Sequence, residues 1–197
     1  ATAPRSSRFR VDGSKPRTPR SQNTTPDAPW LRRYSPASIH SSTVALIERF
    51  GALIPSWIEG RTLPDTVTHG DYRLDNLMFA SERGGYPLAT VDWQTPGHSS
   101  PSADVSYFLG AGPLPEVRRQ IERPLVERYC AALGEYGVSL DGDEFWRQYC
   151  RDAYAGIVMS VVASQIVGSS DRSEAMFAAM ATRHTQHALD VGAEGLL

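Results

Sequence analysis

Apolar side chains recur at helical spacing along most of this chain. The first such stripe follows Ser35 and Pro36, which suit the N-cap and the first position of a helix. Its members lie three or four residues apart and are Val44, Ile47, Phe50, Ile54 and Ile58. A short helix is also expected over residues 103–109.

The second half of the chain is predicted to be almost entirely helical. A longer apolar stripe runs along residues 114–133, where Pro124 either kinks the helix or starts another one. Asp143 suits the N-cap of a long helix that extends to about Val167, and a last helix is expected over about residues 173–191, before Gly192. The stripe consists of Leu114, Val117, Ile121, Leu125, Tyr129 and Leu133.

Between these helical regions the pattern changes to short β-type runs, at residues 66–69, 76–79 and 89–93. The turn-rich residues 81–87, which include Gly84 and Gly85, predict a hairpin that joins the last two runs. We therefore predict a mainly helical α+β fold, in which a small β element is embedded in a helical bundle.

Composition is typical of a soluble globular protein with one sizeable core, because 41% of the 197 residues are apolar and the formal net charge is −2. No apolar run approaches the roughly 20 residues of a membrane-spanning helix, so we expect no membrane contact. The two cysteines, Cys130 and Cys150, form no CxxC pair. Neither a disulfide framework nor a structural zinc site is indicated, and a cytoplasmic location is expected.

The first 28 residues differ from the rest, because they hold six basic residues, two acidic residues and four prolines. Such a segment buries too little apolar surface to offset its ordering entropy. We therefore predict a disordered basic tail over residues 1–28 and a packed domain over residues 29–197. The packed domain then carries a charge of about −6 and is not expected to bind nucleic acid, whereas any binding by the tail would be salt-sensitive.

Three side chains suited to proton transfer or metal binding follow one another in the β region: Asp71, Asn76 and Asp92. Asn76 comes five residues after Asp71, and the expected hairpin would return Asp92 beside Asn76. Phosphoryl transfer needs such a set: one carboxylate orients the attacking hydroxyl and accepts its proton, while an amide and a second carboxylate hold Mg²⁺.

The segments at residues 67–79 and 90–94 resemble the catalytic and metal-binding segments of the aminoglycoside phosphotransferase and choline kinase superfamily, relatives of protein kinases. Residues 29–31 and 104–109 resemble its phosphotransferase enzyme family and ecdysteroid-kinase-like branches. A His-Gly-Asp tripeptide alone would fit an ordinary β-turn, but the order and spacing of the whole set favour kinase-like ancestry. The resemblance implies a protein-kinase-like C-terminal lobe, with the catalytic and metal loops on a small β-hairpin.

The resemblance also implies an activity and its central residues. Asp71 would be the catalytic base, and Asn76 and Asp92 would be the Mg²⁺ ligands. The reaction would transfer the γ-phosphate of ATP or GTP to a hydroxyl of a small molecule, bound between the catalytic loop and the C-terminal helices.

Five further residues receive supporting roles from the resemblance. His69, Gly70 and Asp104 would hold the catalytic loop in place. Arg73 and Asp75 would contact substrate or phosphate, or would only form a surface ion pair.

A nucleotide-binding lobe is not visible in the sequence, which has neither GxGxxG nor GxxxxGK[ST]. Lys15 is the single lysine, and it precedes a proline in the predicted tail. We therefore expect the N-terminal lobe to be missing, residues 1–28 to be foreign to the fold, and a partner or an oligomer to supply the lobe if the chain is active. The alternative is a catalytically silent, pseudokinase-like or truncated lobe that acts as a binding module.

Two remaining groups of residues are expected to be structural. His184 and His187 lie at i and i+3 on the last predicted helix, where a solvated polar face is favoured over a metal pair. Trp57, Trp93 and Trp146 are expected in the core or on the wall of a cleft.

Overall fold

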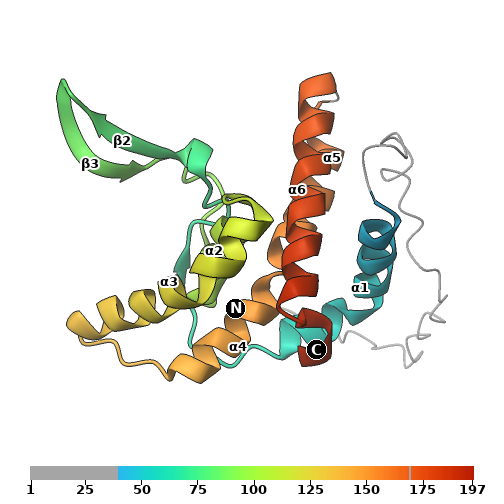
Figure 1. The fold of residues 1–197 in the computed structure, drawn as a ribbon, viewed down its shortest axis with the longest axis horizontal. Coiled ribbons are helices and arrows are strands. Elements are labelled where there is room, and N and C mark those ends of the chain that lie inside the picture. The colour runs from blue at the N-terminus through green and yellow to red at the C-terminus, as the bar shows by residue number, and fades with distance from the viewer. Residues whose placement is uncertain (1–39, 169) are drawn as a thin grey trace, which may run out of the picture.

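A computed structural model describes residues 40–168 and 170–197 (Figure 1). The predicted tail over residues 1–28, the motif at residues 29–31 and the helix start at Ser35 and Pro36 lie outside the described residues. Within the described part the fold is mainly helical, as predicted from the sequence, and it contains two small antiparallel sheets, of which only the hairpin was predicted. No helix in this part of the chain is long and apolar enough to cross a membrane.

The first described helix, α1, spans Ser41–Glu59 and has His40 as its N-cap, whose ring nitrogen accepts a backbone N–H of the first turn. Its predicted apolar stripe is right in the first half and wrong in the second, because Ile54 and Ile58 are exposed. Trp57 turns inward instead, and its ring N–H donates to the backbone carbonyl oxygen of Arg151 at 3.0 Å. The buried apolar residues of α1 are Leu46, Ile47, Phe50 and Trp57.

Two antiparallel strand pairs carry the β residues. The predicted hairpin is confirmed: β2 (Leu77–Ser81) pairs with β3 (Gly84–Thr90), and its turn is tighter than expected because pairing already begins at Gly84. The strand β1 (Thr66–Thr68), which was predicted, pairs with β4 (Gly97–Ser99). The sequence pattern did not predict β4. The third predicted strand ends at Thr90, so Asp92 lies in the segment that follows it.

The helix predicted from Asp143 to about Val167 differs from the structure in its start and in its continuity. The expected long helix after residue 143 is two helices, and its N-cap is Asp141 rather than Asp143. The chain tightens at Ala153 and Tyr154, whose N–H groups bond three residues back, and Tyr154 stacks on Phe50 of α1 at a centroid distance of 4.0 Å. The helices are α2 (Ser102–Ala111), α3 (Pro115–Glu135), α4 (Gly142–Asp152), α5 (Ala155–Ile166) and α6 (Asp171–Asp190).

Helix α3 runs unbroken through Pro124, and its predicted apolar stripe is not the face that it buries. Arg118, Glu122 and Val126 are buried, whereas Leu114, Val117 and Leu125 of the predicted stripe are exposed. Arg118 pairs with Glu122 at 2.7 Å and also with Asp190 at the end of α6. Burying a guanidinium is costly unless acidic partners offset its loss of hydration, and these two partners allow the Arg118 side of α3 to face inward.

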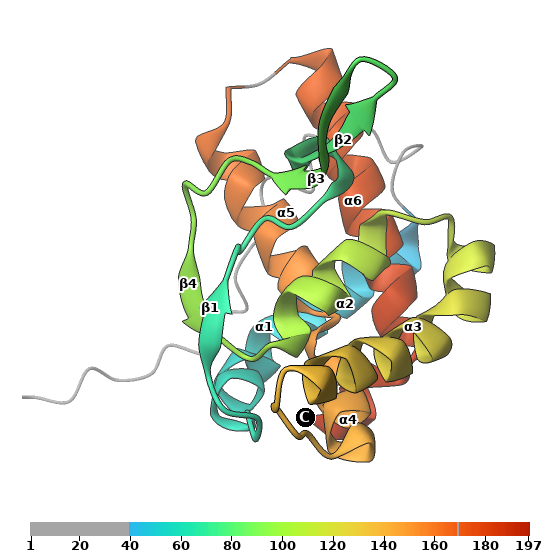
Figure 2. The same cartoon turned by 90° about the vertical axis from the view of Figure 1, so that its left-hand side faces the viewer.

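The helices enclose two apolar clusters. One joins α1, α5 and α6, and the other joins α2, α3 and α4. Helix α2 lies between them and contacts α4, α5, α6 and α3. Figure 2 shows α2 at the centre of the molecule, with β1 and β4 on one side and the hairpin above it. The hairpin projects away from the helices in Figure 1.

Candidate functional site

The segment that joins β1 to β2, residues 69–76, is the centre of the candidate site, and we call it the 69–76 loop. Asp104, in the first turn of α2, accepts the backbone N–H of His69 at 2.6 Å and that of Gly70 at 3.0 Å. Gly70 has a φ of +81°, and a Cβ there would lie 2.3 Å from the carbonyl oxygen of Thr95. Glycine therefore permits the turn that points both N–H groups at one carboxylate.

The His69 side chain ties this loop to the segment after the hairpin. Its Nδ1 accepts the backbone N–H of Asp71 at 3.2 Å, so its ring proton resides on Nε2, which donates to the carbonyl oxygen of Val91 at 2.9 Å. The ring is buried and lies 4.7 Å from the Trp93 ring, between centroids. His69 thus holds the start of the loop against the residues that follow β3.

The Asp71 carboxylate receives hydrogen bonds on both oxygens. Tyr107 of α2 donates its hydroxyl to Oδ1 at 2.8 Å, and the Asn76 amide nitrogen donates to Oδ2 at 3.2 Å. The same amide nitrogen donates to the Asp71 carbonyl oxygen at 2.9 Å. Because the Asn76 nitrogen is committed to Asp71, the amide oxygen is the atom of this buried side chain that suits a hard cation.

Backbone pairing at the base of the hairpin brings the segment that carries Asp92 next to Asn76. The N–H of Val91 donates to the Asn76 carbonyl oxygen at 2.9 Å, and Leu77 is paired with Thr90 in the hairpin. Asp92 is exposed and has a φ of +65°, a left-handed conformation that is uncommon for a non-glycine residue and that clusters at functional sites.

The donor set of Asn76 and Asp92 fits Mg²⁺, which is commonly held by one or two protein ligands together with phosphate oxygens and water. Among residues 40–168 and 170–197, no three His, Cys, Asp or Glu side chains form a metal site by themselves. Any metal here would therefore depend on the amide oxygen of Asn76 and on oxygens from a bound phosphate.

Two hollows flank the 69–76 loop. The smaller one, of about 310 Å³, lies between the loop, the end of α2 and α6, and we call it the α6 pocket. Its polar walls are Arg73, Asp75, Tyr107 and Arg183, and its apolar wall includes Met176 and Met180.

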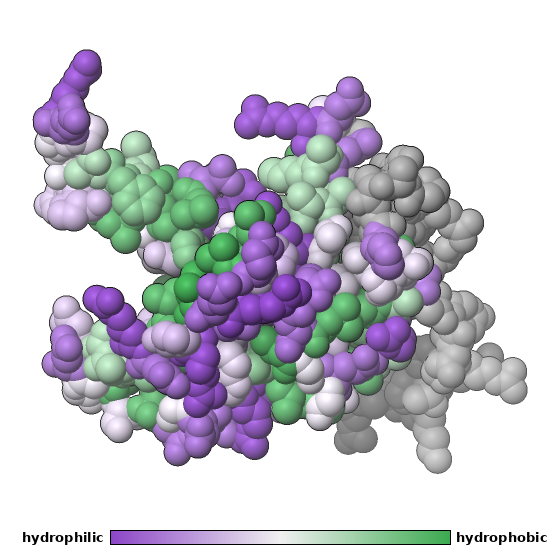
Figure 3. Space-filling view, viewed as in Figure 1, coloured by the Kyte–Doolittle hydropathy of each residue, from purple (hydrophilic) through white to green (hydrophobic). Residues whose placement is uncertain are grey.

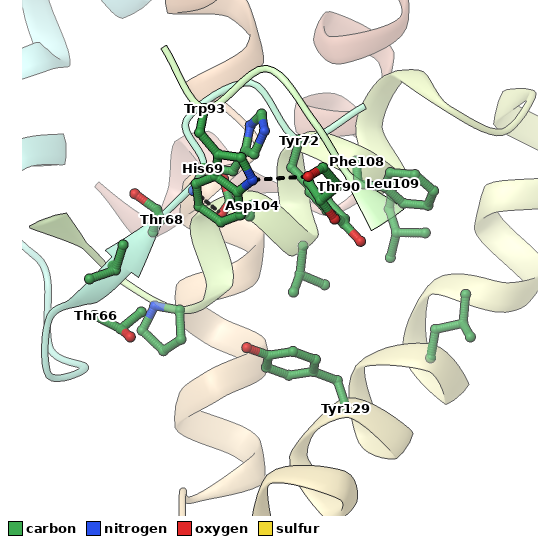
Figure 4. A pocket seen from close by; sticks show the side chains of 14 residues that line it. Thr66, Thr68, His69, Tyr72, Thr90, Trp93, Asp104, Phe108, Leu109 and Tyr129 are labelled. Carbon is green, nitrogen blue, oxygen red and sulfur yellow. Dashed lines mark hydrogen bonds between the residues drawn. The ribbon is translucent and has the colours of Figure 1, made fainter. Parts of the chain in front are cut away.

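The larger hollow, of about 420 Å³, lies on the other side of the loop, between β1, α2 and α3 (Figure 4). Its rings include Tyr72, Trp93, Phe108 and Tyr129. Among the described residues that line it, Asp104 is the one acidic side chain, and its oxygens already accept the two loop N–H groups. Burial, followed by the charge of Asp104, raises the pKa of Tyr129 above its usual value. Figure 3 shows the apolar surface that gathers between the hairpin and α3.

Arg73 and Asp75 both lie at the rim of the α6 pocket. Arg73 Nε is 3.5 Å from Asp71 Oδ2 and 3.6 Å from Asp75 Oδ2, and its Nη1 lies 3.6 Å from the sulfur of Met176. The guanidinium therefore faces the pocket and the Asp71 carboxylate together, whereas Asp75 is mostly exposed.

Sequence reasoning missed Tyr107 and Arg183. Tyr107 follows Asp104 by three residues on α2, so both side chains emerge on the face that meets the 69–76 loop, and helical spacing from Asp104 was the available signal. Arg183 of α6 donates to the carbonyl oxygen of Ala111 at 2.7 Å. No local signal marked Arg183, because it comes to the same pocket as the loop only through the packing of α6 on α2.

The prediction of a solvated face for His184 and His187 is wrong, since both rings are buried. Their space comes from glycines on neighbouring helices: a Cβ at Gly110 or Gly156 would lie 2.5 Å or 2.0 Å from the nearest atom of the His184 ring. His187 Nε2 lies 3.4 Å from Glu122, the buried carboxylate of α3.

Of the four tryptophans, Trp30 lies outside the described residues, and the other three lie in the core or at partly exposed sites. Trp57 is buried, Trp93 forms part of the wall of the larger pocket, and Trp146 stacks on Tyr149 with the Arg123 guanidinium over its face at 4.8 Å.

Comparison with known proteins supports the ancestry that the 69–76 loop suggests. The model of the ecdysteroid kinase-like family matches residues 33–141, which include the loop, the hairpin, α2 and α3. The chain belongs to the ecdysteroid kinase-like family. This is a protein-kinase-like phosphotransferase family.

A curated relative, "Acyl-CoA dehydrogenase family member 10" of Mus musculus, is 33% identical over 121 residues. That alignment covers 61% of this chain and 10% of the relative, so the chain matches about a tenth of the length of that protein. No solved structure matches this chain.

Proposed function

We propose that this member of the ecdysteroid kinase-like family provides the catalytic base and the metal ligands of a small-molecule kinase. The observation that carries the proposal is the arrangement of one carboxylate, Asp71, held by Tyr107 and Asn76 beside the α6 pocket. The reaction is the transfer of the γ-phosphate of ATP or GTP to a hydroxyl group. The finer relationship to aminoglycoside phosphotransferases and choline kinases belongs to the same proposal.

In this mechanism Asp71 accepts the proton of the acceptor hydroxyl, since its carboxylate is partly exposed and contacts Tyr107 and Arg73, two residues that line the α6 pocket. The Asn76 amide oxygen and the Asp92 carboxylate hold Mg²⁺. When bound, the ion neutralises charge on the phosphate oxygens of the nucleotide. His69, Gly70 and Asp104 keep the backbone of the 69–76 loop in the shape that presents these groups.

The α6 pocket is the proposed acceptor site. Its volume lies at the lower end of the range that small-molecule sites occupy. Met176 and Met180 would pack against the apolar body of the acceptor, because thioethers adapt to irregular ligand shapes. Arg73 reaches both this pocket and Asp71, so we propose that it orients the acceptor, or the transferring phosphate, against the base.

A nucleotide also needs a covering lobe, and the hairpin is where we propose that this lobe docks. Met78, Phe79, Tyr86 and Leu88 of the hairpin are exposed, although side chains of these types usually pack against another element. We propose that the lobe comes from outside the described residues, either from a partner chain or from another part of the same protein.

A second candidate function is a catalytically silent binding module. The feature that favours it is the lack of a suitably placed lysine in the described residues. The single lysine, Lys15, lies outside the described residues and precedes a proline, so nothing in the described fold takes the place of the lysine that contacts nucleotide phosphates in kinases.

Calorimetric titration with Mg·ATP distinguishes the two candidates. The phosphotransferase proposal expects Mg²⁺-dependent binding that weakens at least tenfold in Asp92→Asn. The control is Asp143→Asn, which alters an exposed carboxylate that forms an ion pair with Arg123 and is not among the described residues that line either pocket. Absence of Mg²⁺-dependent binding by the intact protein, or equal binding by wild type and Asp92→Asn, would favour the silent module.

A further inference from the structure

Among the described residues, three side chains approach the Asp71 carboxylate, and only Tyr107 comes from the helical body of the protein. Asn76 and Arg73, which also approach this carboxylate, belong to the 69–76 loop itself. Tyr107 is 5% exposed, and burial together with the Asp71 charge raises its pKa well above the usual value. Its hydroxyl therefore stays protonated at neutral pH and donates to Asp71 Oδ1.

The Tyr107 ring is itself fixed by a buried partner. It stacks on the His184 ring of α6, with centroids 5.2 Å apart and an interplanar angle of 20°. His184 fills a space between α2 and α5 that exists because residues 110 and 156 are glycines, as a Cβ at either position would overlap the ring. Three helices thus determine where the Tyr107 hydroxyl lies.

His184 does this as an uncharged ring. Burial, followed by electrostatic repulsion from His187 and Arg118, lowers the pKa of His184 to about 3. Neither ring nitrogen of His184 has a hydrogen-bond partner among the described residues, so packing determines its position. The stack beneath Tyr107 does not change charge at neutral pH.

We infer that Tyr107 is a positioning residue for the catalytic base: its hydroxyl fixes the plane of the Asp71 carboxylate against the acceptor pocket, and His184 fixes Tyr107. The inference rests on the proposed function of Asp71. Hydrogen bonds to the two oxygens from opposite elements, α2 and the 69–76 loop, prevent rotation of the carboxylate. Small misplacements of a reacting group reduce rates strongly, and this bond therefore matters for turnover more than for binding.

The chain contains a matched control for this hydrogen bond. Tyr149 of α4 is fully buried and donates its hydroxyl to Glu122 Oε2 at 3.1 Å, and burial followed by Glu122 raises its pKa well above the usual value. Its ring also lies next to a histidine, His187, at a centroid distance of 5.3 Å. Tyr149→Phe therefore removes the same kind of bond from Glu122, a carboxylate of α3 that has no part in the proposed reaction.

The test compares Tyr107→Phe with Tyr149→Phe in the full chain. The first measurement is the ¹³Cγ NMR signal of Asp71, which should move in Tyr107→Phe and stay in place in Tyr149→Phe. The second is phosphoryl transfer from Mg·ATP to water, which needs no identified acceptor. Tyr107→Phe should lower its turnover number roughly tenfold, as expected for the loss of a hydrogen bond to a charged group, while the Kd for Mg·ATP changes less than twofold.

Two results would overturn the inference: an Asp71 signal in Tyr107→Phe that superimposes on that of the wild type, or an equal loss of turnover in both variants. Failure of the proposed function is a separate result, because a wild type that does not bind Mg·ATP still has the Asp71 signal. In that case the comparison of the two variants decides whether Tyr107 positions Asp71.

The role of His184 is tested by ring replacement. His184→Phe keeps a flat ring beneath Tyr107 and should retain the Asp71 signal and turnover within about threefold, whereas His184→Ala should reproduce the Tyr107→Phe result. Retention of the wild-type Asp71 signal in His184→Ala would contradict the stacking role. If His184→Ala does not fold, a shifted Asp71 signal in His184→Phe would contradict it equally.

Discussion

The 69–76 loop and the β2–β3 hairpin are adjacent in sequence and opposite in construction. In the loop, backbone and side-chain groups are held by partners from elsewhere: Asp104 binds two N–H groups, and Tyr107 binds Asp71. The hairpin projects from the body (Figure 1). Met78, Phe79 and Leu88 on its two strands are exposed. The structure therefore contains one region that is complete within the described chain and one that lacks an apolar partner.

This contrast indicates where rigidity originates. The loop is stabilised by α2, which in turn is packed by four other helices, so its geometry is fixed before any ligand binds. The hairpin is fixed mainly by its own register. Substitutions beneath the loop should therefore reduce folding stability, and substitutions on the hairpin should not.

Removal of the Asp104 carboxylate is expected to have the largest effect. Asp104→Ala leaves the N–H groups of His69 and Gly70 without their acceptor and should lower the free energy of unfolding by about 3 kcal/mol, the sum of two hydrogen bonds to a charged group at the low end of their range. Urea denaturation measures this loss. Asp75→Ala, which removes an exposed carboxylate 3.6 Å from Arg73, should cost less than about 0.5 kcal/mol. Equal losses in the two variants would show that Asp104 does not hold the loop.

A pH effect is expected from Asp152, which accepts hydrogen bonds from Ser102, the first residue of α2, and from Gln148. Burial is the main cause that raises the pKa of Asp152 to about 6. The unfolded chain has the lower pKa, about 3.9, so the folded state binds the proton more tightly. Its contribution to stability is complete below about pH 4 and is lost as the pH rises through about 6, with a total on the order of 2–3 kcal/mol.

Urea midpoints between pH 4 and 7 test this expectation against Asp152→Asn, which has no titrating group at this position. The free energy of unfolding of the wild type, relative to that of Asp152→Asn, should decrease as the pH rises from 4 to 7. A difference that is constant with pH would mean that Asp152 does not titrate in the folded protein near neutral pH.

Gly156→Ala addresses the packing beneath Tyr107. Its added methyl group would lie 2.0 Å from the His184 ring and should cost about 2 kcal/mol, as overpacking of a filled core does. The double variant Gly156→Ala/His184→Ala should be less destabilised than the two single changes added together, because the alanine at 184 vacates the space. Additive losses in thermal unfolding would show that the methyl group and the ring do not compete for the same space.

The sequence was sufficient to predict the elements that local patterns define. The hairpin and the helical character of the remainder are confirmed, as is the kinase-like phosphotransferase family. These features depend on period, turn residues and motif spacing, all of which are local. The roles of Asp71, Asn76 and Asp92 stay predictions.

Burial was not predictable where a distant residue determines it. The inward face of α3 is set by Arg118, which pairs with Asp190, 72 positions later in the chain. His184 is buried because two glycines on other helices leave room for its ring. Similarly, β4 is a strand only through its pairing with β1, in which Val67 lies opposite His98, and three residues carry too little pattern to predict such a strand.

The hairpin should show the smallest effect on stability, and this prediction sharpens the contrast with the loop. Met78→Ser and Phe79→Ser replace side chains that are 60% and 65% exposed, so each should change the free energy of unfolding by less than about 0.5 kcal/mol. The same changes should weaken any association with a nucleotide-binding lobe, because they remove apolar area available to that interface. Urea denaturation measures the first effect, and sedimentation velocity or pull-down with the lobe measures the second. A loss of stability above 1 kcal/mol would mean that the hairpin already packs against the body of this chain and that its apolar side chains do not need an outside partner.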